Sequence, residues 1–374
     1  MTTTPQPAHR NQREHTLPWF WPVAAAFEAG EAGLRLFRQN MEFAAQAENL
    51  VAPPPAGWAS PNDVRLDLDT LRLRDFSTGS RGPCVLVVAP YAGHGSTIAD
   101  LAPDQSLVRT LLDSRLQRVL VTDWKAATSA MRDFDIDKYL AEINVVVDDL
   151  GGNVHLVGLC QGGWMSAMYA ARFPAKVASL VLAGAPIDTA AGHGPLKNIV
   201  HTLPASFYDE LVATGGGLMR GRFMLAGWKN MHPDQQYLGK FIDLYEHVED
   251  RNYVERTDTF ERWYENPVDL PGRYYLQAIH ELFIDNRFAR GEFVGLGRRL
   301  SLGDVHCPAY LLAGSSDDIT PKAQVFAAAG LLGTPPAQVV REVAQGGHIG
   351  LFMGRRTLAE QWPVIARWIA ARGR

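Results

Sequence analysis

Short hydrophobic runs recur along the chain, with helical segments between them. The runs at 84–89 (CVLVVA), 118–123 (RVLVTD), 154–159 (VHLVGL) and 177–183 (VASLVLA) are mostly apolar, which is typical of strands buried on both faces. Helical patterns near 104–115, 136–149 and 162–172 separate them. This alternation predicts an α/β protein with a mostly parallel sheet flanked by helices.

The pattern changes on both sides of these runs. Residues 64–76 alternate between apolar and polar around Asp69-Thr70, which predicts an antiparallel hairpin. From 187 to 300 there is no strand pattern but many aromatic residues, and strand patterns return at 309–313 and 338–343 before a final helix at 357–371. We therefore predict a core of residues 64–186 and 301–374, with 187–300 inserted as a helical cap.

Residues 1–63 are predicted to form a separate N-terminal region. A polar tail (1–18) precedes a predicted helix from Trp19 to about Leu50, and a proline-rich linker follows it. The aromatic start of the helix, Trp19-Phe20-Trp21, has two interpretations. Packing on the main domain is favoured over contact with a lipid or polymer surface.

Composition excludes several classes of protein. With 47% hydrophobic and 20% charged residues among 374, the chain is globular, and its net charge of -4 gives no basic surface for nucleic acid. There is no apolar run long enough to span a bilayer and no signal-peptide pattern at the N-terminus. Cys84 and Cys307 flank predicted strands and are expected to be small buried thiols. We expect a cytoplasmic protein.

The strongest local motif is Gly158-Leu159-Cys160-Gln161-Gly162-Gly163. It lies between a predicted strand and a predicted helix, which is the position of a nucleophile elbow, with Cys in place of the usual Ser. The flanking glycines suit a sharp turn in which side chains would collide with the neighbouring strand and helix. The helix N-terminus favours the thiolate of Cys160, and the amide of Gln161 can donate to an oxyanion. A tight turn around a buried Cys is the alternative.

An acid and a base follow in the order that this type of site requires. Asp317 and Asp318 come just after the strand at 309–313, and His348 lies in a glycine-rich loop after the next strand. Each alone is typical of an ordinary loop, but together with the elbow they predict a triad of Cys160, His348 as base and Asp317 as acid.

A second oxyanion donor is expected in the loop after the first parallel strand, from the backbone amide of Ala92 or Gly93. His94, which follows them, is either part of the site or structural. The histidines repeat no metal-ligand spacing, so no metal is predicted. A Cys nucleophile favours thioester substrates and acyl transfer, because exchange between thioesters keeps the acyl group activated.

These motifs resemble the superfamily of polyhydroxyalkanoate synthases and intracellular depolymerases, over nearly everything from residue 83 to the end. GLCQGG, DLAPDQSLVRTLL, KFIDLYEHVEDRNYVE and FERWYENPVDLPGRYY are similar to the short, partner-dependent synthases known as PhaC. APYAGHGST, APIDT, DDIT and GHIGLFMGRR resemble the depolymerase branch instead. The resemblance implies the α/β-hydrolase fold and a Cys–His–Asp triad.

The resemblance also implies a function. As a synthase, the chain would load a 3-hydroxyacyl group from coenzyme A onto Cys160 and extend a polyester, with coenzyme A thioester as substrate and no cofactor. As a depolymerase or related hydrolase, it would cleave ester or thioester bonds through the same acyl-enzyme. A granule-associated protein with a lapsed site is a third interpretation, which the intact triad disfavours. A homodimer or a partner subunit is expected, and so is a granule surface.

Overall fold

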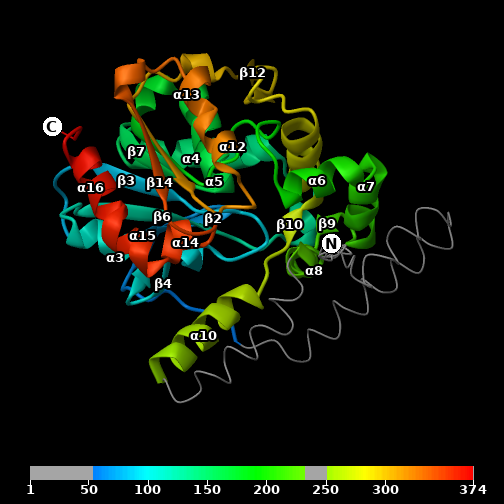
Figure 1. Ribbon diagram of the computed structural model, residues 1–374, viewed down its shortest axis with the longest axis horizontal. Helices are drawn as coiled ribbons and strands as arrows, with labels where there is room; N and C mark the ends of the chain where they lie inside the picture. Colours follow the sequence, from blue (N-terminus) through cyan, green and yellow to red (C-terminus); the bar gives the residue numbers. More distant parts are fainter. Residues whose placement is uncertain (1–53, 232–250, 374) are drawn as a thin grey trace, which may run out of the picture. The chain divides into compact units, whose positions relative to one another are not determined.

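The computed structural model describes residues 54–231 and 251–373, which belong to one compact unit (Figure 1). The predicted tail and N-terminal helix, including Trp19-Phe20-Trp21, lie outside the described residues. The linker is described only in its last part, from residue 54.

The centre of the described chain is a sheet of eight strands in the order β1-β2-β6-β3-β7-β8-β13-β14. The first two strands form the predicted hairpin, and β2 also pairs antiparallel with β6, whereas every later neighbouring pair is parallel. The strands are β1 (Asp63–Asp67), β2 (Leu71–Asp75), β3 (Cys84–Val88), β6 (Arg118–Trp124), β7 (Val154–Leu159), β8 (Val177–Ala183), β13 (Ala309–Gly314) and β14 (Val339–Ala344).

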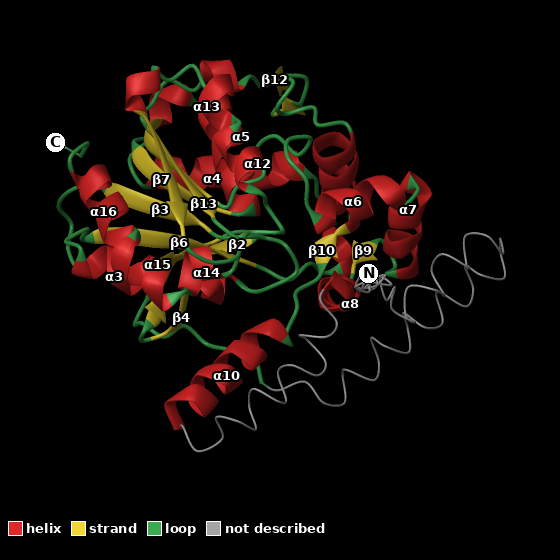
Figure 2. Ribbon diagram, viewed as in Figure 1, coloured by secondary structure: helices red, strands yellow, loops and turns green. Residues whose placement is uncertain are grey.

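Hydrophobic burial explains why these segments form strands. Every residue of β3, β7 and β13 is buried, as expected for parallel strands covered on both faces. Figure 2 shows helices on both sides of the sheet, and α3, α15 and α16 contact one another on one of them. The core helices are α3 (Leu107–Asp113), α4 (Ile136–Asp149), α5 (Gln161–Arg172), α12 (Lys322–Phe326), α13 (Ala328–Leu331), α14 (Gly350–Met353), α15 (Arg355–Glu360) and α16 (Trp362–Ala370).

Strand order places the loops that matter for function. The chain runs from β3 to β6 on one side and later returns to β7 on the other side, so β3 is a switch point of the sheet. In open α/β sheets, ligands bind beyond the carboxyl ends of the strands at such a point. The loops after β3, β7, β13 and β14 all leave the sheet at this edge because these strands are parallel.

The segment between β8 and β13 is a mainly helical insertion, shown in green and yellow in Figure 1. Its elements are α6 (Pro195–Thr202), α7 (Ala205–Thr214), β9 (Leu218–Met219), α8 (Gly221–Met231), α10 (Arg251–Tyr264), β10 (Leu270–Pro271), α11 (Gly272–Gln277), the π-helix η5 (Ala278–Ile284), β11 (Val294–Gly295) and β12 (Arg298–Arg299). The expectation of no strand here was wrong in detail. Two short antiparallel pairs, β9 with β10 and β11 with β12, are too brief to leave an alternating pattern in the sequence.

Other sequence predictions needed local correction. The helix predicted at 104–115 begins only at Leu107, because Gln105 and Ser106 form a short strand (β5) with Asp100–Ala102 (β4). The final helix is broken into α15 and α16 next to Pro363, which has no backbone N–H to continue the first helix. Cys84 is buried as expected, but Cys307 is partly exposed. Among the described helices, none is both long and apolar enough to cross a membrane.

Candidate active site

Cys160 is held in a strained turn between β7 and α5. Its φ of 49° and ψ of -117° are unusual for any residue other than glycine, and its N–H donates to the Ala183 carbonyl of the neighbouring strand at 2.9 Å. Such a conformation costs about 1–3 kcal/mol and persists at functional sites where the surrounding structure enforces it. The predicted elbow is therefore present as geometry: a buried thiol at the start of a helix.

The glycines of the motif allow the helix to pass very close to the sheet. A Cβ on Gly162 would lie 2.0 Å from the Val88 carbonyl oxygen, and one on Gly163 would lie 2.3 Å from Cβ of Ala185. A Cβ on Gly158 would meet Cα of Gly163 at 2.4 Å. Glycine is required at these three positions because side chains would push α5 away from β3, β7 and the residues that follow β8, as the sequence predicted.

Asp317 lies in the loop after β13 with its side chain fully buried. One carboxylate oxygen, Oδ1, accepts hydrogen bonds from the amides of Ile319 (3.1 Å) and Thr320 (2.8 Å). The other, Oδ2, lies 2.8 Å from Nδ1 of His348. The carboxylate is thus fixed by its own loop and directed at the imidazole.

Two loops meet to make this contact. The amides of Ser315 and Ser316, after β13, donate to the carbonyls of Ala344 and Gly346, at 2.8 and 3.1 Å. Since β13 and β14 are neighbouring parallel strands, their following loops are brought together at one edge of the sheet. The predicted acid and base therefore meet although they are 31 positions apart in the sequence.

His348 lies between Asp317 and Cys160. Its ring is buried and packs edge-on against Phe352, with 5.2 Å between ring centroids. Burial alone would lower the pKa of His348, but the charges of Cys160 and Asp317, with the hydrogen bond to Asp317, raise the pKa to about 10. A base with a raised pKa, held by Asp317 on one side and close to the thiol on the other, can accept the proton of Cys160.

Several polar atoms around Cys160 have no partner among the described residues. Nε2 of His348, Oε1 of Gln161 and Nε1 of Trp164 are buried without a regular hydrogen bond. The backbone N–H of Gln161 begins α5 and so has no acceptor within the helix. The role of Gln161 as an oxyanion donor stays a prediction.

The loop that contains Ala92 and Gly93 follows β3, the strand next to β7. Gly93 has a φ of +92°, which favours glycine, and it is covered by Met224 of α8, which a Cβ at Gly93 would meet at 3.2 Å. The structure places the loop at the same sheet edge as Cys160. Which of the two amides donates to an oxyanion remains a prediction.

His94, whose role the sequence left open, is bound to the insertion. Its Nε2 donates to the Tyr264 carbonyl at 3.0 Å, and its ring stacks with those of Trp263 and Tyr264 at 4.7 and 5.0 Å. Burial, with the charge of Lys229, lowers the pKa of His94 to about 4, so the ring is neutral at pH 7. In this conformation His94 links two parts of the chain. Asp318, whose role the sequence also left open, is not part of the Asp317–His348 contact.

An aromatic cluster lies behind the elbow, and sequence reasoning missed its main member. Tyr274 of α11 is fully buried, its hydroxyl lies 3.6 Å from Sδ of Met165, and its ring stacks on Trp164 with 6.1 Å between centroids. Burial and the charges on Tyr91 and Cys160 raise the pKa of Tyr274 far above its ordinary value. Trp164, bulky after a glycine pair, is accommodated because α11 supplies this partner. The only signal was the general richness of 187–300 in aromatic residues.

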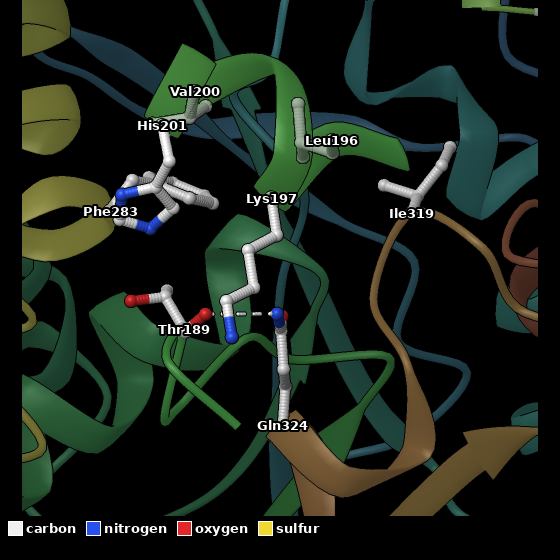
Figure 3. A pocket seen from close by; sticks show the side chains of 8 residues that line it. All are labelled: Thr189, Leu196, Lys197, Val200, His201, Phe283, Ile319 and Gln324. Carbon is white, nitrogen blue, oxygen red and sulfur yellow. Dashed lines mark hydrogen bonds between the residues drawn. The ribbon is translucent and has the colours of Figure 1, made fainter. Parts of the chain in front are cut away.

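Two recesses lie beside the insertion, among the described residues. One lies next to the Asp317 loop, between α6 and η5, and Figure 3 shows Lys197 and His201 of α6 above Thr189 and Gln324, whose amide donates to the Thr189 carbonyl at 3.2 Å. It has no room for a water molecule. The other is an open groove of about 530 Å³ lined by Arg132, Asp133, Val212, Gly217, Arg273, Leu276, Gln277, His280 and Glu281. Neither is lined by Cys160 or His348.

In residues 54–231 and 251–373, no three His, Cys, Asp or Glu side chains are grouped so that they could hold an ion.

Solved structures show the fold. The chain is similar to a monoacylglycerol lipase from Paleococcus ferrophilus, with a TM-score of 0.52, 16% identity and coverage of 81% of this chain and 99% of the lipase. It is also similar to mouse α/β-hydrolase domain-containing protein 10, with a TM-score of 0.50, 15% identity and coverage of 83% and 98%. The predicted α/β-hydrolase fold is confirmed.

The family model and the sequence relatives give a narrower classification than the fold does. The chain belongs to the family described as "Protein of unknown function (DUF3141)", which matches residues 73–330. It is 28% identical over 328 residues to the poly(3-hydroxyalkanoate) polymerase subunit PhaC of Haloferax mediterranei, covering 84% of this chain and 64% of that protein. It is 28% identical over 295 residues to the protein of the same name from Allochromatium vinosum, covering 77% of this chain and 79% of that protein. The predicted resemblance to PhaC is confirmed. The chain nevertheless spans less than two thirds of the Haloferax relative.

Proposed function

We propose that this protein is a polyhydroxyalkanoate synthase-like acyltransferase that forms polyester from 3-hydroxyacyl-coenzyme A through an acyl-thioester on Cys160. The observation that supports the proposal most is the constellation at the sheet edge: a buried thiol at an elbow, beside a His348 that Asp317 holds at 2.8 Å. The similarity to proteins named polymerase subunits supports the choice of acyl group.

The proposed reaction has two stages. His348 takes the proton of Cys160, the thiolate attacks the thioester carbonyl, and coenzyme A leaves as a thiol with a proton from His348. Next, the hydroxyl of a bound hydroxyacyl group loses its proton to His348 and attacks a Cys160-bound acyl group. The Cys–acyl thioester bond breaks, the Cys160 thiolate leaves and takes the proton back from His348, and the new ester lengthens the polyester by one unit. Coenzyme A thioester is the substrate, and no cofactor takes part. Asp317 keeps His348 oriented throughout.

Hydrolysis by the same residues is the second candidate. The segments APYAGHGST and GHIGLFMGRR, which contain His94 and His348, resemble depolymerases. In this case water replaces the hydroxyl in the second stage and releases a free acid. Both candidates share the acyl-enzyme on Cys160 and differ only in the acceptor that reaches it.

For either function we expect a homodimer or a partner subunit and a polyester granule surface. The relatives are named as subunits, which supports a partner.

One experiment tests the proposal. The purified chain is mixed with 3-hydroxybutyryl-coenzyme A, and thiol release, product size and protein mass are followed together. Synthase activity predicts thiol release with products of two or more units, and a covalent acyl adduct that Cys160→Ala abolishes. Release of only free hydroxy acid would favour hydrolysis. Adduct and product that persist in Cys160→Ala would contradict the assignment of the nucleophile.

A further inference from the structure

A short stretch of the insertion contacts the predicted oxyanion loop repeatedly. We call this stretch, Trp263–Asp269, the cap seam. It begins at the end of α10 and leads into β10, and it lies about 170 residues away in sequence from the loop Tyr91–Gly95. Its contacts are with successive parts of that loop, which makes it a candidate for shaping the site.

Three hydrogen bonds join the two segments through the loop backbone and His94. The amide of Val268 donates to the Gly93 carbonyl at 2.8 Å, and the indole N–H of Trp263 donates to the Gly95 carbonyl at 2.8 Å. His94 returns a hydrogen bond to the Tyr264 carbonyl at 3.0 Å. Three consecutive loop residues are therefore fixed by one stretch of the insertion.

Aromatic packing reinforces these bonds. The ring of His94 lies almost parallel to that of Tyr264, at 12°, and is stacked at 30° on that of Trp263. Both aromatic side chains are buried, with about 5% of Trp263 exposed. Stacked aromatic pairs contribute stabilisation beyond their buried area, so the seam holds His94 by packing as well as by hydrogen bonding.

The far end of the seam anchors the other side of the loop. The hydroxyl of Tyr91 donates to the Asp269 carbonyl at 3.3 Å and to the Lys125 carbonyl at 3.0 Å. The amide of Ala127 donates to the same Asp269 carbonyl at 2.9 Å. Tyr91 is completely buried, so the first residue of the loop cannot move independently of the seam.

The two predicted donors lie between these anchors. Tyr91 is fixed on one side of Ala92, and the peptide between Gly93 and His94 is fixed on the other, because a planar peptide cannot turn its carbonyl without turning its amide. Only the few backbone angles between these two fixed points can change the direction of the N–H groups of Ala92 and Gly93. Oxyanion stabilisation depends on donors that already lie 2.7–3.1 Å from the position of the developing charge.

We propose that the cap seam sets the orientation of the oxyanion amides, with His94 and Trp263 as positioning residues. The inference rests on the acyl-enzyme chemistry proposed above, and it applies to a synthase and to a hydrolase equally. It also assigns a function to His94 that does not require it to touch the substrate.

The test compares two reactions of Cys160. Acylation by a thioester or an aryl ester forms an oxyanion, whereas alkylation by iodoacetamide displaces iodide without one. Two variants weaken the seam while keeping an aromatic ring: His94→Phe loses the bond to Tyr264, and Trp263→Phe loses the bond to Gly95. His94→Gln keeps a donor without the stacked ring. Trp368→Phe, in the remote pair of Trp368 with Tyr310, is the matched control.

We expect His94→Phe and Trp263→Phe to slow acylation by about 10- to 100-fold, since loss of one whole oxyanion donor costs about 100- to 1,000-fold. The alkylation rate should stay within about twofold of wild type. His94→Gln should recover part of the acylation rate, and Trp368→Phe should match wild type in both reactions. The pre-steady-state burst of thiol or p-nitrophenol gives the acylation rate.

Two results would overturn the inference: acylation rates equal to wild type in both seam variants, or acylation and alkylation that fall together. Use of p-nitrophenyl butyrate beside 3-hydroxybutyryl-coenzyme A separates this test from that of the proposed function. A wild-type chain that reacts with the ester but not with the thioester contradicts the synthase proposal and still reports on the seam. A wild-type chain that reacts with neither the ester nor the thioester contradicts both the synthase proposal and the inference about the cap seam.

Discussion

Asp317 and His348 are joined by a 2.8 Å contact between Oδ2 and Nδ1, and the other oxygen of Asp317 is occupied by two amides of its own loop. Oδ1 is therefore held by the loop, and Oδ2 is the carboxylate oxygen that holds His348. Asp317 thus holds Nδ1 of His348, which leaves Nε2 as the nitrogen that exchanges a proton with the thiol. In the proposed reaction, Asp317 orients His348 and does not need to reach the substrate.

Replacement of Asp317 by Asn should keep the fold and lose the activity. The Asn carbonyl can still accept the two loop amides, but its NH₂ faces Nδ1 and forces the wrong tautomer of His348. A loss of turnover of about 10⁴-fold is expected by analogy with other triads. Steady-state thiol release from an acyl-thioester measures it. Asp318→Asn is the matched control, and an equal loss in that variant would move the acid role to Asp318.

The backbone strain at Cys160 should have a measurable effect on the free energy of unfolding. Glycine tolerates the φ of 49° at this position, so Cys160→Gly should be more stable than Cys160→Ala by about 1 kcal/mol, despite the entropy that glycine loses on folding. Cys84 in β3 gives the comparison, because in an ordinary strand Ala should be more stable than Gly. Urea unfolding of the four variants provides the values. The same order at both positions would mean that the elbow stores no strain.

Close packing of α5 against the sheet predicts a severe effect of a single methyl group. Gly162→Ala places a Cβ 2.0 Å from the Val88 carbonyl oxygen and should destabilise the fold by about 3 kcal/mol. Gly330→Ala in α13 is the control, since open space surrounds that position and Ala favours a helix, so a neutral or slightly stabilising effect is expected. Thermal unfolding of both variants tests this. Equal melting temperatures would contradict the packing argument.

The lowered pKa of His94 predicts a dependence of stability on pH. An unfolded His titrates near 6.5 and folded His94 near 4, so the unfolded state binds more protons between these values. His94 should therefore lower the free energy of unfolding as the pH falls from 6.5 towards 4, by about 3 kcal/mol in total.

This contribution can be isolated by difference. Burial also lowers the pKa of His155 to about 4, so wild type loses stability from both residues on acidification. His94→Phe should remove only the contribution of His94. The gap in the free energy of unfolding between wild type and variant should therefore narrow from pH 7 to pH 5. Denaturant unfolding at several pH values measures the gap. A constant gap would show that His94 keeps an ordinary pKa.

Local sequence patterns were enough to predict most of the sheet. The runs at 84–89, 154–159 and 177–183 are apolar at nearly every position, and such segments have few stable alternatives to a buried strand. The elbow at Cys160 was also predictable, because only glycine satisfies the close approach of α5 to the sheet at 158, 162 and 163. Two-residue strands such as β9 and β10 were missed because they span a single period of alternation, which leaves no repeat to recognise.

The sequence by itself determined the type of fold, the thiol at the elbow and the order in which Asp317 and His348 follow it. These depend on short-range features: apolar runs, glycines and strand-following loops. Only the tertiary structure decided that Asp317 and His348 meet at 2.8 Å, that Tyr274 covers Trp164, and that His94 stacks on Trp263 and Tyr264. Those contacts join residues 31 to 170 positions apart, and they arise because parallel strand order and packing of the insertion bring distant segments to one sheet edge.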